Sequence, residues 1–289
     1  MDLRGILLGV GFAVMWSSAF TSAKFIVADA PPLTALALRF AVSGTLGVAI
    51  ALWLGQSWRL TRGQWRATVV FGLCQNALYL GLNFVAMQTI DAGLASIVAS
   101  TMPLLVALAG WLAMGERLKA AGVAGLMAGL LGVAIIMGSR ISGGVDLTGL
   151  GLCVAGVLAL TAATLSVRGA SSGGNVLMVV GLQMLVGAAI LAVAGALLEP
   201  LRVTWSATLV AAFFYTTLVP GLLATFTWFV LVRRIGPVRA ATFHFLNPFL
   251  GVAIASLILG ERVGPLDLLG VAVIMAGILA VQLAKADPA

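Results

Sequence analysis

The chain has 289 residues, of which 62% are hydrophobic and only 9% are charged, and its mean hydropathy is +1.16. A soluble domain carries about 25% charged residues, so this composition excludes a water-soluble globular protein and predicts an integral membrane protein. The apolar runs are continuous rather than alternating, which favours helices over a β-barrel. The net charge of +7 does not indicate nucleic-acid binding, because the basic residues are spread over short loops.

About 20 apolar residues span a bilayer, and cutting the chain at its polar and Gly/Pro-rich positions predicts ten such segments. In chain order they cover residues 4–28, 33–54, 65–86, 92–114, 118–138, 147–168, 174–198, 205–232, 238–259 and 265–284. The first is too long and too polar for a cleaved signal peptide, so we predict a retained helix. Lys and Arg are more frequent on the side of the membrane that holds both termini, which predicts that both termini are cytoplasmic.

The chain contains an internal repeat. "PLLVALAGWLAMGERLKAAGVAGLMAGLLG" (103–132) aligns without a gap on "PFLGVAIASLILGERVGPLDLLGVAVIMAG" (248–277), and both copies read P-x12-E-x8-G-x6-G. We therefore predict two five-helix repeats, residues 1–138 and 147–284. An odd number of helices makes the second repeat enter the membrane upside down. Inverted repeats are the architecture of alternating-access transporters, whose substrate site lies near the midplane between the copies.

The Pro…Glu…Gly…Gly signature in both halves, over ten helices in two fives, resembles the EamA type of the drug/metabolite transporter superfamily. The chain length and the "WSSAF" (16–20) of the first helix are most similar to bacterial exporters of aromatic and other hydrophobic amino acids. The resemblance implies an all-α, multi-pass protein of the bacterial inner membrane, monomeric or homodimeric, with a central cavity lined by helices 1, 3, 4, 8 and 9. It also implies a small-molecule substrate, membrane lipid as the surroundings, no nucleic-acid partner, no cofactor and no enzymatic activity.

The nine acidic residues fall at helix ends or in connections, and none lies at mid-depth of a predicted span. Intramembrane carboxylates are the usual proton relays and cation sites of pumps. Their absence argues against a metal-ion or organic-cation substrate and favours a neutral, zwitterionic or weakly anionic one. One histidine and two separated cysteines, Cys74 and Cys153, are too few for clustered catalytic or metal ligands, so a membrane enzyme is disfavoured.

Polar and aromatic residues recur at helical spacing on the helices that the resemblance places around the cavity. The candidate substrate-binding residues are Trp16, Ser17, Phe20, Asn76, Tyr79, Asn83, Ser100, Met102, Trp228, His244 and Asn247. Structural alternatives stay open, because Ser side chains in membrane helices often bond their own backbone and Asn side chains often join neighbouring helices.

The only histidine lies in "AATFHFLNPFLG" (240–251), the repeat counterpart of "ASIVASTMPLLV" (95–106). The proline is common to both copies and belongs to the fold. His244 and Asn247 are where the copies differ, since Ala99 and Met102 stand at the matching positions. We therefore place both in the pocket, with His244 as the one side chain able to titrate near neutral pH.

Pro103, Pro248 and the pair Pro220–Gly221 interrupt apolar helices and are predicted hinges, with a static kink as the alternative. The pairs Glu116–Arg117 and Glu261–Arg262 are predicted structural clasps of helical hairpins, with a gate as the alternative.

Small residues in the fifth and tenth helices predict close packing, as scaffold or dimer surface. They are Gly122, Gly125, Gly129, Gly132, Gly270, Ala276 and Gly277. Lys24 and Arg39 lie toward the outer side, where each could attract a carboxylate; for Arg39 we favour snorkelling to lipid headgroups.

The sequence thus predicts a secondary transporter that exports amino acids by alternating access. The alternatives keep the fold and change the cargo, to a purine, a dye or another metabolite, or remove energy coupling and leave a facilitator.

Overall fold

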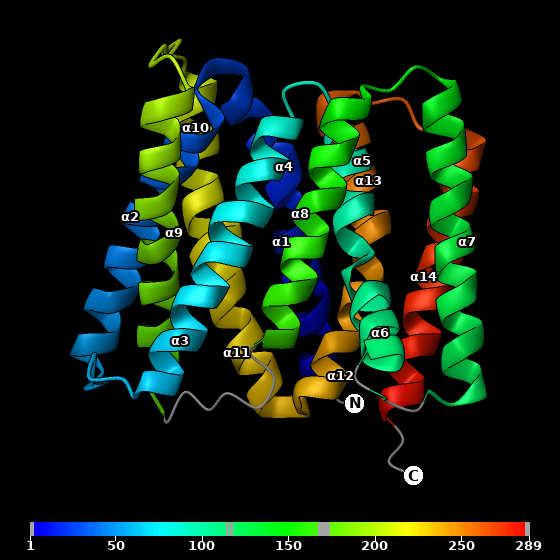
Figure 1. The fold of residues 1–289 in the computed structure, drawn as a ribbon, viewed down its shortest axis with the longest axis horizontal. Coiled ribbons are helices and arrows are strands. Elements are labelled where there is room, and N and C mark those ends of the chain that lie inside the picture. The colour runs from blue at the N-terminus through cyan, green and yellow to red at the C-terminus, as the bar shows by residue number, and fades with distance from the viewer. Residues whose placement is uncertain (1–2, 114, 116–117, 167–173, 287–289) are drawn as a thin grey trace. The chain divides into compact units, whose positions relative to one another are not determined.

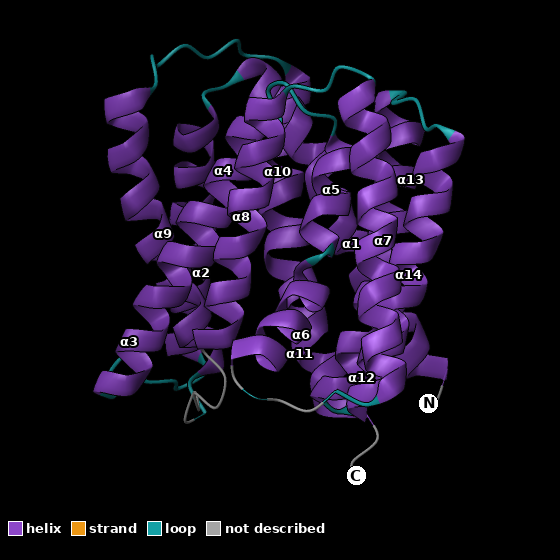
Figure 2. Cartoon of the chain, turned by 45° about the vertical axis from the view of Figure 1, so that its right-hand side comes forward, coloured by secondary structure: helices purple, strands orange, loops and turns teal. Residues whose placement is uncertain are grey.

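The computed structural model describes residues 3–113, 115, 118–166 and 174–286. Within these ranges every regular element is a helix (Figure 1, Figure 2), and ten helical spans are long and apolar enough to cross a membrane. The predicted all-α fold with ten transmembrane helices is confirmed. Glu116 and Arg117 lie outside the described residues, so the clasp predicted for this pair is not seen.

Several spans are built from more than one helical element. The first five spans are α1 (Leu3–Asp29), α2 (Pro32–Trp53), α3–η1–α4 (Arg62–Phe71, Gly72–Tyr79, Leu80–Ala86), α5–α6 (Ala92–Ser100, Met102–Ala113) and α7 (Ala120–Ser142). The second five are α8 (Leu147–Ser166), α9 (Val176–Leu198), α10–η2–α11 (Ala207–Thr216, Thr217–Leu223, Ala224–Ile235), α12–η3–α13 (Pro237–Thr242, Phe243–Leu246, Asn247–Leu259) and α14 (Pro265–Ala286).

Irregular helical segments recur at the repeat spacing. The π-helices η1 and η2 begin at Gly72 and Thr217, and 217 − 72 = 145. The helices α7 and α14 begin at Ala120 and Pro265, again 265 − 120 = 145. The two halves of the chain therefore share the positions of their helix starts and of their π-helices.

The fourth and ninth spans are both interrupted just before a proline. Thr101 separates α5 from α6, and the 3-10 segment η3 separates α12 from α13. Pro103 and Pro248 are each the second residue of the helix that follows. A proline is tolerated in a first helical turn because its missing N–H has no partner there. These prolines therefore begin new helices instead of bending a continuous one.

The chain divides into two compact units. The first unit contains residues 1–21, 89–150 and 223–289, and the second contains 22–88 and 151–222. Each unit contains helices from both predicted repeats. The compact units, which are defined by contacts in space, therefore do not coincide with the repeats, which are defined by the sequence. The physical reason is that helices of one half pack against their counterparts in the other half, as α7 does on α14 and α2 on α9.

Glycines permit the close approach of α7 and α14 in the first unit. A Cβ atom on Gly277 would lie 2.5 Å from the backbone nitrogen of Gly129 and 2.6 Å from the carbonyl oxygen of Gly125. A Cβ on Gly132 would lie 2.8 Å from the carbonyl oxygen of Gly270. Backbones can approach this closely only where side chains are absent, so glycines of the predicted set form the contact between the two helices, whereas Ala276 of the same set is exposed.

The second unit uses the same device between α2 and α9. A Cβ on Gly44 would lie 2.9 Å from the carbonyl oxygen of Gly181, and one on Gly47 would lie 3.3 Å from the Cα of Gly181. On the neighbouring π-helix, a Cβ on Gly72 would lie 2.8 Å from the carbonyl oxygen of Gln183. The α9 helix thus packs on α2 and η1 through glycines on each.

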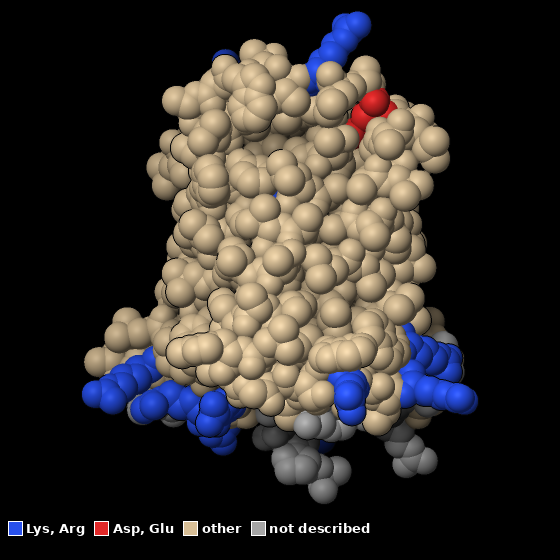
Figure 3. Space-filling model, turned by 90° about the vertical axis from the view of Figure 1, so that its left-hand side faces the viewer, with Lys and Arg blue, Asp and Glu red and all other residues tan. Residues whose placement is uncertain are grey.

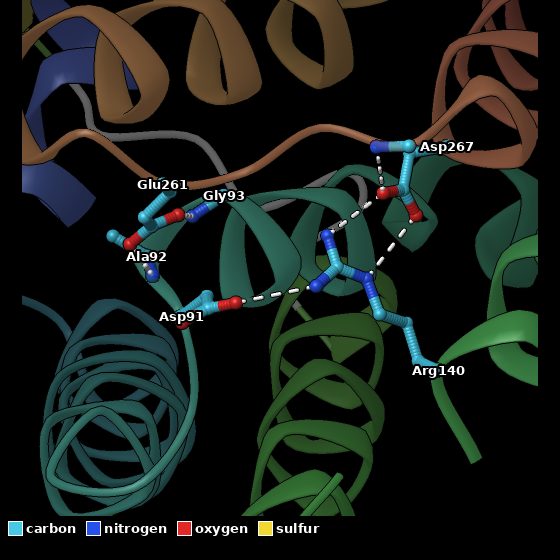
Figure 4. Close-up of polar contacts among 7 residues, drawn as sticks. Asp91, Ala92, Gly93, Arg140, Glu261 and Asp267 are labelled. Atoms are coloured by element: carbon cyan, nitrogen blue, oxygen red, sulfur yellow. Dashed lines mark hydrogen bonds and ion pairs between the residues drawn. The ribbon is translucent and has the colours of Figure 1, made fainter. Parts of the chain in front are cut away.

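Carboxylates close the helix ends of the first unit (Figure 4). Glu261, between α13 and α14, accepts hydrogen bonds from the backbone N–H groups of Ala92 (2.7 Å) and Gly93 (2.9 Å) at the start of α5. Nearby, Arg140 pairs with Asp91 (3.2 Å) and Asp267 (2.9 Å). Glu261 therefore holds the start of α5, which differs from the predicted clasp within its own helical hairpin.

The face of the molecule drawn in Figure 3 has its Lys and Arg side chains gathered mainly at one end. A broad band with almost no charged atoms covers the middle of this face. Large apolar side chains such as Leu46 (41%) and Val193 (62%) are exposed on α2 and α9. Exposed apolar side chains over a charge-free band are expected where a surface contacts lipid.

Candidate substrate-binding site

Four rings from three separate helical segments lie together in the first unit. Phe12 and Trp16 come from α1, Trp228 from α11 and His244 from η3. The ring centroids of Phe12 and Trp228 are 4.9 Å apart, and the His244 ring is 5.3 Å from each of them. We call these four residues the aromatic cluster.

The local structure explains why the rings of the aromatic cluster meet. Phe12 and Trp16 are four residues apart on α1, so they share a helix face, and their centroids are 5.7 Å apart. The His244 ring is edge-on to both, with interplanar angles of 84° to Phe12 and 90° to Trp16. Edge-to-face contacts of this kind are favoured because the positive edge of one ring meets the negative face of another.

An apolar core beside the aromatic cluster fixes the segments that carry Trp228 and His244. Leu231, Ala240 and Phe243 are buried together, with Trp228 packed against them. On the other side Gly9 of α1 faces the Phe243 ring, and any side chain at Gly9 would collide with that ring. The absence of a side chain at Gly9 therefore lets α1 approach η3 closely enough for the aromatic cluster to form.

A chain of polar side chains runs along one edge of the aromatic cluster. Asn247 Nδ2 donates to Nδ1 of His244 at 3.0 Å, and Ser17 Oγ donates to Oδ1 of Asn247 at 3.5 Å. We call these three residues the polar chain. An amide nitrogen only donates, so Nδ1 of His244 accepts and the neutral ring carries its proton on Nε2.

The exposure of these side chains indicates which of them a ligand can reach. Phe12, Ser17 and Asn247 are buried, whereas Trp16, Trp228 and His244 are half-buried. The accessible ring surface of the cluster is therefore that of the two tryptophans and the histidine, while Phe12 supports them from behind.

The candidates Asn76, Tyr79 and Asn83 belong to the second unit, not to the unit that holds the aromatic cluster. All three are buried on η1 and α4. Asn83 Nδ2 donates to the carbonyl oxygen of Tyr79 at 2.8 Å, and Asn83 Oδ1 has no partner among the described residues. The amide of Asn83 thus stabilises the backbone at the end of the π-helix through its nitrogen, and its oxygen remains an unused acceptor among the described residues.

The remaining candidates have varied surroundings. Phe20 is buried on α1. Ser100 Oγ donates to the carbonyl oxygen of Ser96 at 2.7 Å, the structural use left open for such residues. Met102 is half-buried at the start of α6. Among the predicted hinges, Pro220 and Gly221 lie inside the π-helix η2.

Phe12 and Arg39 differ from the sequence-based expectation. Phe12 belongs to the aromatic cluster although it is not among the predicted binding residues, and its spacing of four residues from Trp16 is the signal that indicates it. The expectation that Arg39 snorkels to lipid headgroups is wrong, because only 6% of Arg39 is exposed. Lys24, the other cation considered as a carboxylate partner, donates from Nζ to the carbonyl oxygen of Met87 at 2.7 Å, at the end of α4.

Comparison with known proteins identifies relatives over the whole chain. The model of the EamA-like transporter family matches residues 3–138 and 147–283. The uncharacterized transporter YvbV of Bacillus subtilis is 26% identical over 259 residues, which are 89% of this chain and 85% of YvbV. The aromatic amino acid exporter YddG of Ancylobacter novellus is 31% identical over 137 residues, 47% of each chain.

The fold also has a counterpart among solved structures. One crystal structure superposes with a TM-score of 0.71 at 22% identity, covering 99% of this chain and 100% of the other. At that level of identity the likeness concerns the fold alone.

Proposed function

Since the chain belongs to the EamA-like transporter family, we propose that it exports aromatic and other hydrophobic amino acids from the cytoplasm by alternating access. The protein is a multi-pass transporter of the bacterial inner membrane and not an enzyme. The specific proposal concerns its cargo and its transport cycle.

The observation that carries the cargo proposal is the aromatic cluster with the polar chain along its edge. The half-buried rings of Trp16 and Trp228 offer apolar faces on which an aromatic or aliphatic side chain can stack. The same faces attract an ammonium group through the ring quadrupole. This matters because none of the described carboxylates lies at mid-depth of a span to bind the amine. Ser17 and Asn247 supply hydroxyl and amide groups beside these rings.

One relative, which is similar to nearly half of this chain, is an aromatic amino acid exporter, and this supports the choice of cargo. An aromatic cluster suits a ligand with one large apolar side chain, because pockets for such ligands are mostly apolar with a few placed polar groups. A purine or a dye would also stack on these rings, so the test of the proposal includes both.

Alternating access is supported by the recurrence of irregular segments in both halves of the chain. The π-helices begin 145 residues apart (217 − 72), and a break precedes Pro103 in one half and Pro248 in the other. In the proposed arrangement, residues 1–138 and 147–284 are inverted five-helix repeats with both termini in the cytoplasm. Repeats of this kind rock around a central site, and the prolines and Gly221 are proposed hinges of that motion.

The test is transport by the purified full-length protein in proteoliposomes. We expect uptake of radiolabelled phenylalanine, tryptophan and leucine, and no uptake of adenine or ethidium. We also expect counterflow, in which unlabelled substrate inside accelerates the entry of label, since only a carrier shows it. Transport of adenine or ethidium without any amino acid would replace the proposed cargo. Uptake of amino acids without counterflow would replace the carrier by a channel.

A further inference from the structure

Arg39 is a buried cation in a membrane-spanning helix. It is the eighth residue of α2 (Pro32–Trp53), and only 6% of it is exposed. Its Nε is buried and has no hydrogen-bond partner, and among the described residues no carboxylate pairs with it. Ionisable residues inside membrane spans are rare and are usually paired or functional, so the missing counter-charge requires an explanation.

The guanidinium points into the second unit, toward the middle of another span. Its Nη2 lies 3.5 Å from the point that a Cβ of Gly221 would occupy. Gly221 is the fifteenth residue of the 29-residue span Ala207–Ile235, so it stands at the centre of that span. A snorkelling arginine reaches for the headgroups. Arg39 instead lies beside Gly221, at the centre of the span Ala207–Ile235.

The groups around the guanidinium are polar, but none of those identified carries a negative charge. Ser43 Oγ and the carbonyl oxygen of Thr216 lie 3.7 Å and 3.2 Å from the same Cβ position of Gly221. The Phe40 ring is 5.1 Å from the guanidinium carbon. A ring face and a carbonyl dipole stabilise a cation partly, whereas an ion pair needs an anion.

Gly221 places no side chain against the guanidinium. It is a residue of the π-helix η2, directly after Pro220. A Cβ at position 221 would lie 3.5 Å from Nη2 and 3.2 Å from the carbonyl oxygen of Thr216, so any side chain there would pack directly on the guanidinium. The planar guanidinium fork binds carboxylates through two parallel hydrogen bonds, and such a group would provide the missing negative charge.

We propose that Arg39, with Ser43 and Gly221 beside it, is an anion subsite within the second unit that binds the carboxylate of an amino acid. This rests on the proposed function in one respect, namely that the ligand is an amino acid. The subsite itself requires only a small carboxylate. In this arrangement the protein supplies the cation and the cargo supplies the anion, so no carboxylate is needed at mid-depth of the described spans to pair with Arg39.

The experiment measures competition against uptake of radiolabelled phenylalanine in proteoliposomes. The competitors are phenylalanine and 3-phenylpropionate, which carry a carboxylate, and phenylalaninol, which replaces the carboxylate by an alcohol. For Arg39→Gln we expect the inhibition constants of the two carboxylates to rise on the order of tenfold or more, as for the loss of a charged hydrogen bond. The constant for phenylalaninol should change by less than about threefold. Arg39→Lys should restore part of the discrimination, because it keeps the charge and loses the fork.

Two further variants keep the test open if Arg39→Gln fails to fold. Gly221→Ala places a methyl group next to Nη2. It should raise the inhibition constants of the two carboxylates more than that of phenylalaninol. Arg202→Gln removes an exposed cation of the same unit and should leave all constants unchanged. Two results would overturn the subsite. Either both variants raise the inhibition constants of the carboxylates and of phenylalaninol by the same factor, or neither variant changes any of these constants.

A second measurement separates this proposal from the proposed function. The thermal unfolding temperature of the full-length protein in detergent is recorded with acetate, benzoate or 3-phenylpropionate at constant ionic strength. Stabilisation that Arg39→Gln abolishes supports the subsite even if no amino acid is transported. If phenylalanine is transported and Arg39→Gln distinguishes carboxylates from phenylalaninol as well as the unchanged protein does, the proposed function is supported and the subsite is rejected.

Discussion

Asn247 donates a hydrogen bond from its amide nitrogen to Nδ1 of His244 across 3.0 Å. The bond occupies the ring nitrogen that a second proton would need, so the imidazolium can form only if this hydrogen bond is broken or the amide turns over. Because Oδ1 of the same amide accepts from Ser17, turning it over would also disturb the contact with α1. Protonation of His244 is thereby coupled to the contact between α1 and α13.

The first prediction concerns coupling to protons. His244 is the only side chain of the described spans whose ordinary titration lies near neutral pH. If export uses a proton gradient, we expect His244→Gln to transport substrate with the same rate in the presence and absence of that gradient. The measurement is uptake in proteoliposomes with an imposed pH difference. Coupling that survives in His244→Gln would remove this residue from the mechanism.

The second prediction concerns the aromatic cluster. We expect Trp228→Ala to raise the KM for tryptophan about tenfold, because aromatic contacts contribute roughly 0.5–1.5 kcal/mol beyond simple burial. Trp228→Phe should recover part of the loss. The matched control is Trp205→Ala, since Trp205 is 79% exposed outside the helices. An unchanged KM in Trp228→Ala, with normal expression, would place the substrate elsewhere.

The third prediction concerns the contact of α7 with α14. Gly277→Ala puts a methyl group 2.5 Å from a backbone nitrogen of α7, so the two helices must separate. We expect a destabilisation of roughly 1–3 kcal/mol, typical of overpacking, seen as a lower thermal unfolding temperature.

Gly138→Ala is the control for this change, because nothing lies within 4 Å of a Cβ at Gly138 on α7. Alanine favours a helix over glycine, so this variant should be neutral or slightly stabilised. Equal unfolding temperatures for the Gly277→Ala and Gly138→Ala variants would contradict the close packing described here.

The fourth prediction concerns the clasp on α5. Glu261→Ala leaves the N–H groups of Ala92 and Gly93 without their carboxylate and should cost about 1–2 kcal/mol of stability, as for the loss of a helix N-cap. Glu261→Gln keeps one acceptor oxygen, for one of the two N–H groups, and should cost less. Thermal unfolding followed by intrinsic tryptophan fluorescence compares the two. A Glu261→Gln variant as unstable as Glu261→Ala would contradict a stabilising contribution from the one hydrogen bond that it retains.

Much of the fold could be predicted from the sequence because a bilayer imposes length and hydropathy on every span. The predicted segment 118–138, for example, corresponds to α7 at Ala120–Ser142. The breaks before Pro103 and Pro248 and the π-helices were not predicted as such. Hydropathy averages over a window and does not detect one extra residue per turn.

The candidate site was predicted less completely, because it depends on contacts between distant parts of the chain. His244 and Asn247 were found through the divergence of the two repeat copies. Phe12 was missed, since a phenylalanine in an apolar helix looks like any lipid-facing residue until Trp228 is placed against it. The direction of Arg39 could not be predicted either, because the residue that its guanidinium faces, Gly221, lies on a helix far along the chain.

The two π-helices allow side chains of the third and eighth spans to change the direction in which they face. Each residue of an α-helix turns the chain by about 100°, so an inserted residue rotates everything beyond it by that amount. If the insertion in η1 slid by one turn, only the residues that it passed, Asn76 and Tyr79 among them, would swing to a new face. The helix would keep its length and nearly all of its hydrogen bonds, so these side chains could meet different neighbours without any helix having to move aside.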